Sequence, residues 1–112
     1  MHSFVIFRFL NFAFMSLPIK NISELESLLR KEKFFERYGI SKIGVFGSFA
    51  RGENFNDIDL LIEDAISLES AFKLKSELEE KIQLKVDVIL KKFAEPIILY
   101  RAMKDIQYAA AA

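Results

Sequence analysis

The sequence predicts one α/β or α+β domain in which three strands alternate with helices, and three observations support this. The chain has 112 residues, which suits a single domain with a modest core. Apolar residues make up 52%, as in a folded globular chain. Apolar residues at helical spacing alternate with short apolar runs, and no repeat or linker interrupts them. The predicted order is helix, strand, short helix, strand, helix, strand, helix.

Charge and composition exclude several classes of function. Lysine plus arginine and aspartate plus glutamate each number 16, so the chain lacks the basic excess of a general nucleic-acid binder. It has no cysteine, which excludes disulfides and thiolate zinc sites. The same absence is compatible with a reducing cytoplasm, where we expect the protein to act without a membrane. His2 is the sole histidine, so a metal site must use oxygen ligands.

The first fourteen residues differ from the rest of the chain. The run HSFVIFRFLNFAF is rich in phenylalanine, but it is too short for a membrane span, carries a charge and lacks clear signal-peptide features. From Met15 the pattern becomes that of an ordinary domain. We therefore interpret residues 1–14 as an extension from a misassigned start and residues 15–108 as the domain. The alternative is a strand or docking segment that buries its phenylalanines against a partner.

Two long helices are predicted from capping residues and apolar spacing. The first covers residues 21–39, where Asn21 or Ser23 can cap, Ser23 and Glu26 fit a capping box, and Gly39 is a suitable stop. Its apolar residues at helical spacing are Ile22, Leu25, Leu28, Leu29 and Phe35. The second helix covers residues 67–84, with a mostly apolar face formed by Leu68, Phe72, Lys75, Leu78 and Ile82.

Three short apolar runs predict the strands, and a last helix follows them. The runs are SKIGVFG, DIDLLIE and KVDVIL, which occupy residues 41–47, 57–63 and 85–90. Pro96 suits the first turn of the last helix, which we expect to run to about Gln107. The alanines of residues 109–112 are interpreted as a frayed tail.

Asp57 and Asp59 are unusual because charge is costly inside an apolar run. On a strand, residues i and i+2 point to the same face, so these carboxylates project together while Ile58 and Leu60 point to the core. Like charges this close raise a pKa unless a cation lies between them. A divalent metal such as Mg²⁺ explains the pair, although solvated aspartates are common at strand ends without one.

Other stretches favour a site for phosphate and metal. Gly47 and Ser48 follow the first strand, where a glycine lets backbone N–H groups approach a phosphate and the hydroxyl adds a donor. Arg51 suits a phosphate oxygen, or else it pairs on the surface with Glu53. Asp87 lies in the third strand and adds a third carboxylate if that strand lies beside the second.

Together these residues resemble the minimal nucleotidyltransferase (MNT) domain of the DNA polymerase β-like superfamily. The resemblance covers roughly residues 20–105 and rests on Gly47-Ser48, Ala50-Arg51-Gly52, Asp57-Ile58-Asp59-Leu60 and Asp87. It implies a palm-like α+β fold, a mixed sheet flanked by helices in the order given above.

The resemblance also implies a reaction. Two Mg²⁺ ions would hold a nucleoside triphosphate, ATP by this interpretation, while an acceptor hydroxyl attacks the α-phosphate and pyrophosphate leaves. Asp57 and Asp59 would bridge the metals, and Asp87 would ligate the catalytic metal and help deprotonate the acceptor. The residues implied to hold the β- and γ-phosphates are Gly47, Ser48 and, in support, Arg51.

Small free-standing members of this family resemble antitoxins whose partner is a helical HEPN-type ribonuclease toxin. The resemblance implies that the chain inhibits such a toxin, by transferring AMP to a tyrosine hydroxyl on it or by binding alone. All three aspartates are present, which favours the enzyme. The alternative is a non-catalytic module that binds a nucleotide or the toxin and neutralises it stoichiometrically. A nucleotidyltransferase of small molecules such as antibiotics is disfavoured by the short chain.

Overall fold

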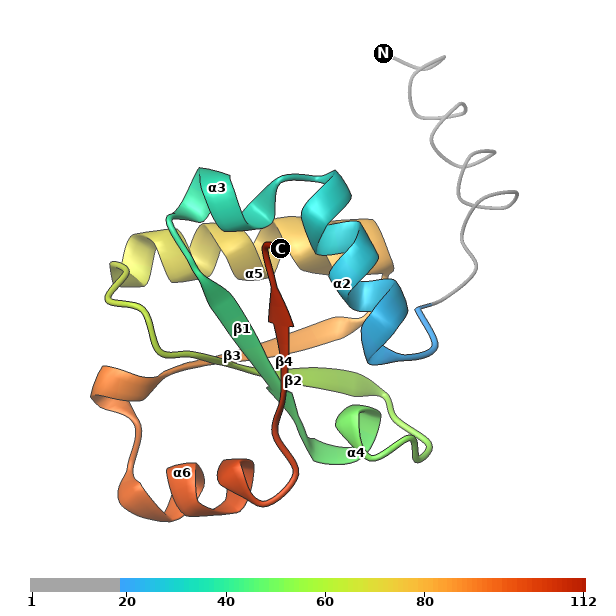
Figure 1. Cartoon of the computed structure of the whole chain (residues 1–112). Helices are drawn as coiled ribbons and strands as arrows, with labels where there is room; N and C mark the ends of the chain where they lie inside the picture. Colours follow the sequence, from blue (N-terminus) through green and yellow to red (C-terminus); the bar gives the residue numbers. More distant parts are fainter. Residues whose placement is uncertain (1–18) are drawn as a thin grey trace.

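The computed structural model describes residues 19–112, so the predicted extension of residues 1–14 lies outside the described residues. In chain order, the elements are α2 (Ile22–Lys31), α3 (Phe34–Tyr38), β1 (Lys42–Phe46), α4 (Gly47–Ala50), β2 (Asp57–Ile62), α5 (Leu68–Ile82), β3 (Lys85–Leu90), the 3-10 helix η1 (Lys91–Phe93), α6 (Pro96–Met103) and β4 (Gln107–Ala110) (Figure 1). Among these residues, no helix has the length and apolar character needed to cross a membrane.

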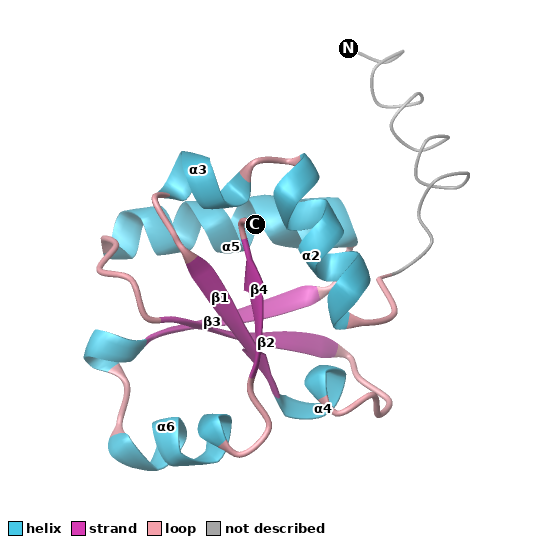
Figure 2. Cartoon of the chain, in the orientation of Figure 1, coloured by secondary structure: helices cyan, strands magenta, loops and turns pink. Residues whose placement is uncertain are grey.

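The four strands form one mixed sheet in the order β3-β2-β1-β4 (Figure 2). Strands β2 and β3 run parallel, whereas β1 is antiparallel to both β2 and β4. A parallel pair needs a long crossover connection, and α5 provides it. The predicted α+β fold, a mixed sheet flanked by helices, is confirmed, with one strand more than expected.

Helices α2, α3 and α5 lie together on one face of the sheet, α6 lies on the other side, and α4 lies at the end of β1 (Figure 1). The core between the three helices and the sheet is apolar because alternate strand residues point into it. The strand residues that fill it include Ile43, Val45, Ile58, Leu60 and Val86. The residues between them therefore face the opposite side, termed here the site face.

The predicted first helix is divided in two. Lys33 takes a left-handed backbone with φ of 58°, which an α-helix does not contain, and Gly39 ends α3 at φ of 67°. Asn21, rather than Ser23, caps α2, because its side-chain oxygen accepts the N–H of Glu24 at 2.9 Å.

The predicted apolar face of the second helix is wrong in part. The stripe that α5 turns to the core consists of Ala71, Leu74, Leu78 and Ile82. Leu68 and Phe72 are 62% and 71% exposed, and Lys75 pairs with Glu79 at 2.8 Å. Both stripes fit a 3.6-residue period and share Leu78 and Ile82, but in the first half of the helix the buried stripe runs one residue earlier than predicted. Packing against the sheet selects the stripe that begins with the small Ala71.

The end of the chain also differs from expectation. Helix α6 ends before Gln107, and the expected frayed tail instead contributes to β4, which pairs with β1. Ala109 is fully buried. The N–H of Ala110 donates to Glu26 Oε2 at 2.9 Å, and its carbonyl accepts from Arg30 Nε at 2.8 Å. Backbone hydrogen bonds and contacts with α2 hold this strand in place. A run of alanines gives no sequence signal for either interaction.

Candidate active site

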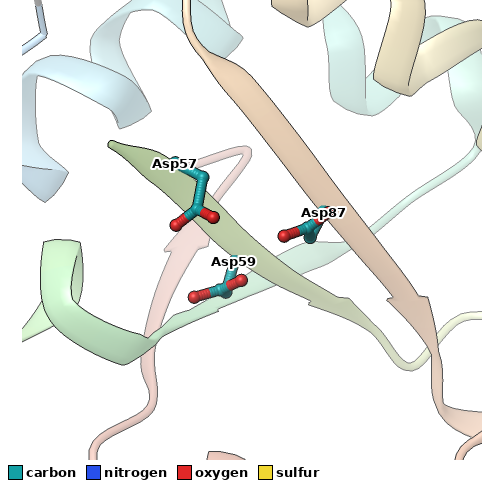
Figure 3. Close-up of side chains that lie close together, drawn as sticks. All are labelled: Asp57, Asp59 and Asp87. Atoms are coloured by element: carbon teal, nitrogen blue, oxygen red, sulfur yellow. The ribbon is translucent and has the colours of Figure 1, made fainter. Parts of the chain in front are cut away.

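Strand β2 carries the two predicted aspartates on the site face. Ile58 and Leu60 are fully buried in the core, and Asp57 and Asp59 are half-buried on the opposite side. Figure 3 shows both carboxylates projecting from the same side of the strand. The two carboxylates lie on one face because side chains alternate along a strand, so Ile58 between them and Leu60 after them point into the core.

Strand β3 adds Asp87 to the same face. In the parallel ladder, Asp59 is the direct register partner of Asp87. One carboxylate oxygen from each of Asp57, Asp59 and Asp87 lies within 4.8 Å of the others (Figure 3). The structure therefore brings together the three aspartates singled out in the sequence, and they are termed the aspartate cluster below.

The aspartate cluster is electrostatically unfavourable without a counter-charge. Burial, followed by the charges of Asp57 and Asp87, raises the pKa of Asp59 from 3.8 to about 6. Lys85 supplies one cation, with Nζ at 3.8 Å from Asp87 Oδ1. One exposed lysine does not neutralise three carboxylates. Closely spaced carboxylate oxygens are the hard ligands that Mg²⁺ and similar ions prefer, so the residues fit a divalent metal.

The turn after β1 brings the backbone against the aspartate cluster. Gly47 has a φ of 81°, a left-handed conformation that favours glycine, and a Cβ at this position would collide with the Asp59 carboxylate. Ser48 follows in α4 and is half-buried, and its hydroxyl has no hydrogen-bond partner among the described residues. The close approach that the sequence predicted for a glycine at this turn is thus made toward Asp59.

Asp105, which sequence reasoning missed, binds the same turn. Its Oδ1 accepts the N–H of Gly47 at 3.3 Å, and its Oδ2 accepts from Arg51 Nη1 at 2.5 Å. Arg51 also pairs with Glu53, Nη2 to Oε1 at 3.1 Å, which is the surface pairing weighed from the sequence. Asp105 lies between α6 and β4, far from Arg51 along the chain, so no local pattern marks it.

Taken together, these groups place phosphate donors beside metal ligands. The Gly47 N–H, the Ser48 hydroxyl and the Arg51 guanidinium all belong to one short segment, and that segment touches Asp59 through Gly47. A polyphosphate held there is repelled by the aspartate cluster unless a cation lies between them. The arrangement therefore suits a metal–polyphosphate complex, with a carboxylate available to accept a proton.

Comparison with known proteins agrees with this geometry. A family model described as polymerase beta, nucleotidyltransferase matches residues 29–107. The protein adenylyltransferase MntA of Thermococcus cleftensis is 34% identical to this chain over 98 residues, which cover 82% of this chain and 99% of that protein.

Solved structures share the fold. A mutant of the toxin–antitoxin pair MntA-HpeT aligns with a TM-score of 0.62 at 20% identity, covering 82% of this chain and 73% of that one. A complex of tri-AMPylated Shewanella oneidensis HEPN toxin with MNT antitoxin aligns with a TM-score of 0.52 at 19% identity, covering 76% and 72%. Since the family model spans most of the chain and the Thermococcus relative is matched over nearly its whole length, the chain belongs to the polymerase beta nucleotidyltransferase family.

Proposed function

We propose that this chain is a protein adenylyltransferase that transfers AMP from ATP to a tyrosine hydroxyl of a HEPN-type toxin and so acts as its antitoxin. The observation that carries the proposal is the aspartate cluster beside the turn at Gly47. The Thermococcus relative is named a protein adenylyltransferase, and one structural neighbour holds an AMPylated HEPN toxin with an MNT antitoxin. We place this activity in the cytoplasm, which suits a chain without cysteine.

Asp57, Asp59 and Asp87 are proposed to hold two Mg²⁺ ions. When bound, the ions would supply positive charge to the transferred phosphoryl group and to the leaving pyrophosphate. The contribution of the chain is to hold the ligands in place before the nucleotide arrives. The ladder between β2 and β3 sets Asp59 opposite Asp87, and both side chains project from strands rather than from loops.

The chemical step is a displacement at the α-phosphorus of ATP. The acceptor oxygen forms a bond to that phosphorus, the bond to the bridging oxygen breaks, and pyrophosphate leaves. The Asp87 carboxylate accepts the proton of the acceptor hydroxyl. The Ser48 hydroxyl, and the Gly47 N–H once Asp105 releases it, hold the β- and γ-phosphates, and Arg51 supports them by exchanging Asp105 for a phosphate oxygen.

A labelling experiment tests the proposal. ATP labelled at the α-phosphate is incubated with the chain, a HEPN-type toxin and Mg²⁺, and the label on the toxin is counted. We expect label from the α-phosphate but not from the γ-phosphate, and none after the metal is chelated. Asp59→Asn should lower the transfer by about a hundredfold or more, because an amide has no full charge to hold a divalent ion.

Asp64→Asn is the matched control. It makes the same chemical change just beyond β2, where Asp64 Oδ2 accepts the N–H of Ser41 at 3.0 Å, outside the aspartate cluster. We expect this variant to transfer label as the unchanged chain does. If the unchanged chain labels no toxin but still neutralises it, the chain is a stoichiometric binding module and the adenylyltransferase proposal is wrong.

A further inference from the structure

Helix α6 and the last residue of η1 present exposed apolar side chains. Phe93, Ile97, Tyr100 and Met103 are 63%, 50%, 63% and 44% exposed. Within α6, only Ala102 is fully buried. Ile97, Tyr100 and Met103 recur every three residues, so they share one side of the helix. These four side chains are termed the α6 strip, and neighbouring large apolar groups left in solvent are typical of an interaction surface.

The α6 strip is bordered by cations that have no ion-pair partner among the described residues. These cations are Lys92, Arg101 and Lys104. The Nζ of Lys92 lies 5.2 Å from the centre of the Phe93 ring, and that of Lys104 lies 4.8 Å from the centre of the Tyr100 ring. Glu95 is the one carboxylate from Lys92 to Lys104, and Asp105 follows them. The strip is therefore locally basic in a chain whose formal net charge is zero.

The segment that carries the α6 strip leads directly into the candidate active site. The residue that ends this segment, Asp105, holds the Gly47 N–H and the Arg51 guanidinium. Figure 1 shows α6 on the side of the sheet opposite α2, α3 and α5, which is the side that the aspartate cluster faces. A protein that covers the α6 strip therefore lies on the same side of the sheet as the groups proposed to bind ATP.

We propose that the α6 strip docks the protein that carries the acceptor hydroxyl, through an apolar patch bordered by aspartate or glutamate side chains. The proposal rests on the proposed function, in which the acceptor is a protein. The described residues form a single sheet with its helices, and the α6 strip is an exposed apolar surface of this domain. An acidic border is required because a partner without carboxylates would cover Arg101 and Lys104 and leave their charges unpaired.

Two other arrangements fit the structure less well. A second copy of the chain, related by a twofold axis, would bring the cations around one α6 strip against the same cations of the other, and this repulsion opposes the contact. The exposed Leu68 and Phe72 of α5 lie in the helical layer on the other face of the sheet. A protein docked there is separated from the aspartate cluster by the sheet.

The test compares variants of the two exposed surfaces in binding to a HEPN-type toxin without nucleotide. Tyr100→Asp and Arg101→Glu change the α6 strip and its border. Phe72→Asp and Lys73→Glu are the matched changes on α5, where Lys73 is exposed and pairs with Glu69. Calorimetry measures the affinity for the toxin at low and high salt, and separately the affinity for Mg²⁺-ATP. Thermal melts confirm that each variant folds.

We expect Tyr100→Asp and Arg101→Glu each to weaken toxin binding by about tenfold or more, and the α5 variants to bind within about twofold of the unchanged chain. Salt should weaken binding by the unchanged chain and have less effect on Arg101→Glu. The affinity for Mg²⁺-ATP should stay the same in all four variants. Because this measurement needs no transfer, it stands even if the labelling experiment shows that the chain is not an enzyme.

Several results would overturn the proposal. These are toxin binding that survives Tyr100→Asp, toxin binding that is lost in Phe72→Asp instead, and no toxin binding by the unchanged chain. If Arg101→Glu weakens ATP binding and spares the toxin, the cations serve the nucleotide. If the unchanged chain sediments as a dimer that Tyr100→Asp dissociates, the α6 strip is a contact between copies.

Discussion

The fold without a metal disfavours the ionised form of Asp59. Its pKa is raised from 3.8 to about 6 by burial and by the neighbouring carboxylates. A carboxyl whose folded pKa is raised favours folding while it is protonated, and this contribution is lost as the pH rises through the folded value. The ionised cluster is therefore a cost above pH 6 that is absent below pH 4.

Asp59→Asn should therefore stabilise the metal-free protein at high pH. We expect a gain of about 1 kcal/mol in the free energy of unfolding at pH 8, allowing for solvent screening of a half-exposed group, and almost none at pH 4. Urea unfolding in a chelator at both pH values measures it. If the variant is less stable than the unchanged chain at pH 8, repulsion between the ionised carboxylates does not destabilise the metal-free fold.

Gly47 is the second residue on which the site depends. Gly47→Ala should cost about 2 kcal/mol or more, because alanine is strained at φ of 81° and its Cβ would collide with Asp59. Gly52→Ala is the control, since Gly52 also has positive φ, 73°, but open space around it. The control should cost about 1 kcal/mol. Urea unfolding measures the loss in the free energy of unfolding for both variants. Equal losses would show that a collision with Asp59 does not contribute.

At the scale of elements, α2 depends on its first residue. Asn21→Ala should lower the free energy of unfolding by about 1 kcal/mol, because the Glu24 N–H loses its acceptor. Ser23→Ala, at the other capping residue considered from the sequence, should change little, since the Ser23 side chain accepts no hydrogen bond in the described structure. Thermal melts of the two variants decide between the caps, and a larger loss for Ser23→Ala would reverse the assignment.

Strand β4 is expected to contribute strongly to the stability of the domain. Removing residues 107–112 should destabilise the protein by several kcal/mol, on the order of the loss of a ladder and of a buried side chain, because β1 then becomes an unpaired edge. Removing residues 111–112 alone should have no measurable effect, since β4 ends at Ala110. Chemical unfolding compares the two, and equal stability would mean that β4 is dispensable.

At this scale, the sequence predicts only the features that depend on residues close together along the chain. The strand containing Asp57 and Asp59 was readable because a two-residue period and the cost of buried charge both act within a few residues. The role of Asp105 could not be predicted in this way, because it accepts a hydrogen bond from Arg51, which lies 54 positions away in the sequence. Strand β4 was missed because an alanine run has no apolar alternation. The buried stripe of α5 depended on which side met the sheet.

At the scale of the whole molecule, opposite charges are separated on one side of the sheet. The aspartate cluster is negative, and the border of the α6 strip is positive, although the formal net charge of the chain is zero. A metal–nucleotide complex is suited to the first and an acidic protein surface to the second. This division lets a short chain serve two binding partners from one face.

The aspartate cluster is proposed to be required for AMP transfer to a protein, and the mass of the partner shows whether that transfer has occurred. A HEPN-type toxin is co-expressed with the unchanged chain or with the double variant Asp57→Asn, Asp59→Asn, and each complex is purified and weighed intact. We expect a toxin carrying one or more AMP groups with the unchanged chain, and an unmodified toxin, still in complex, with the variant. An unmodified toxin that the unchanged chain nevertheless neutralises, or a toxin that the double variant still modifies, would contradict it.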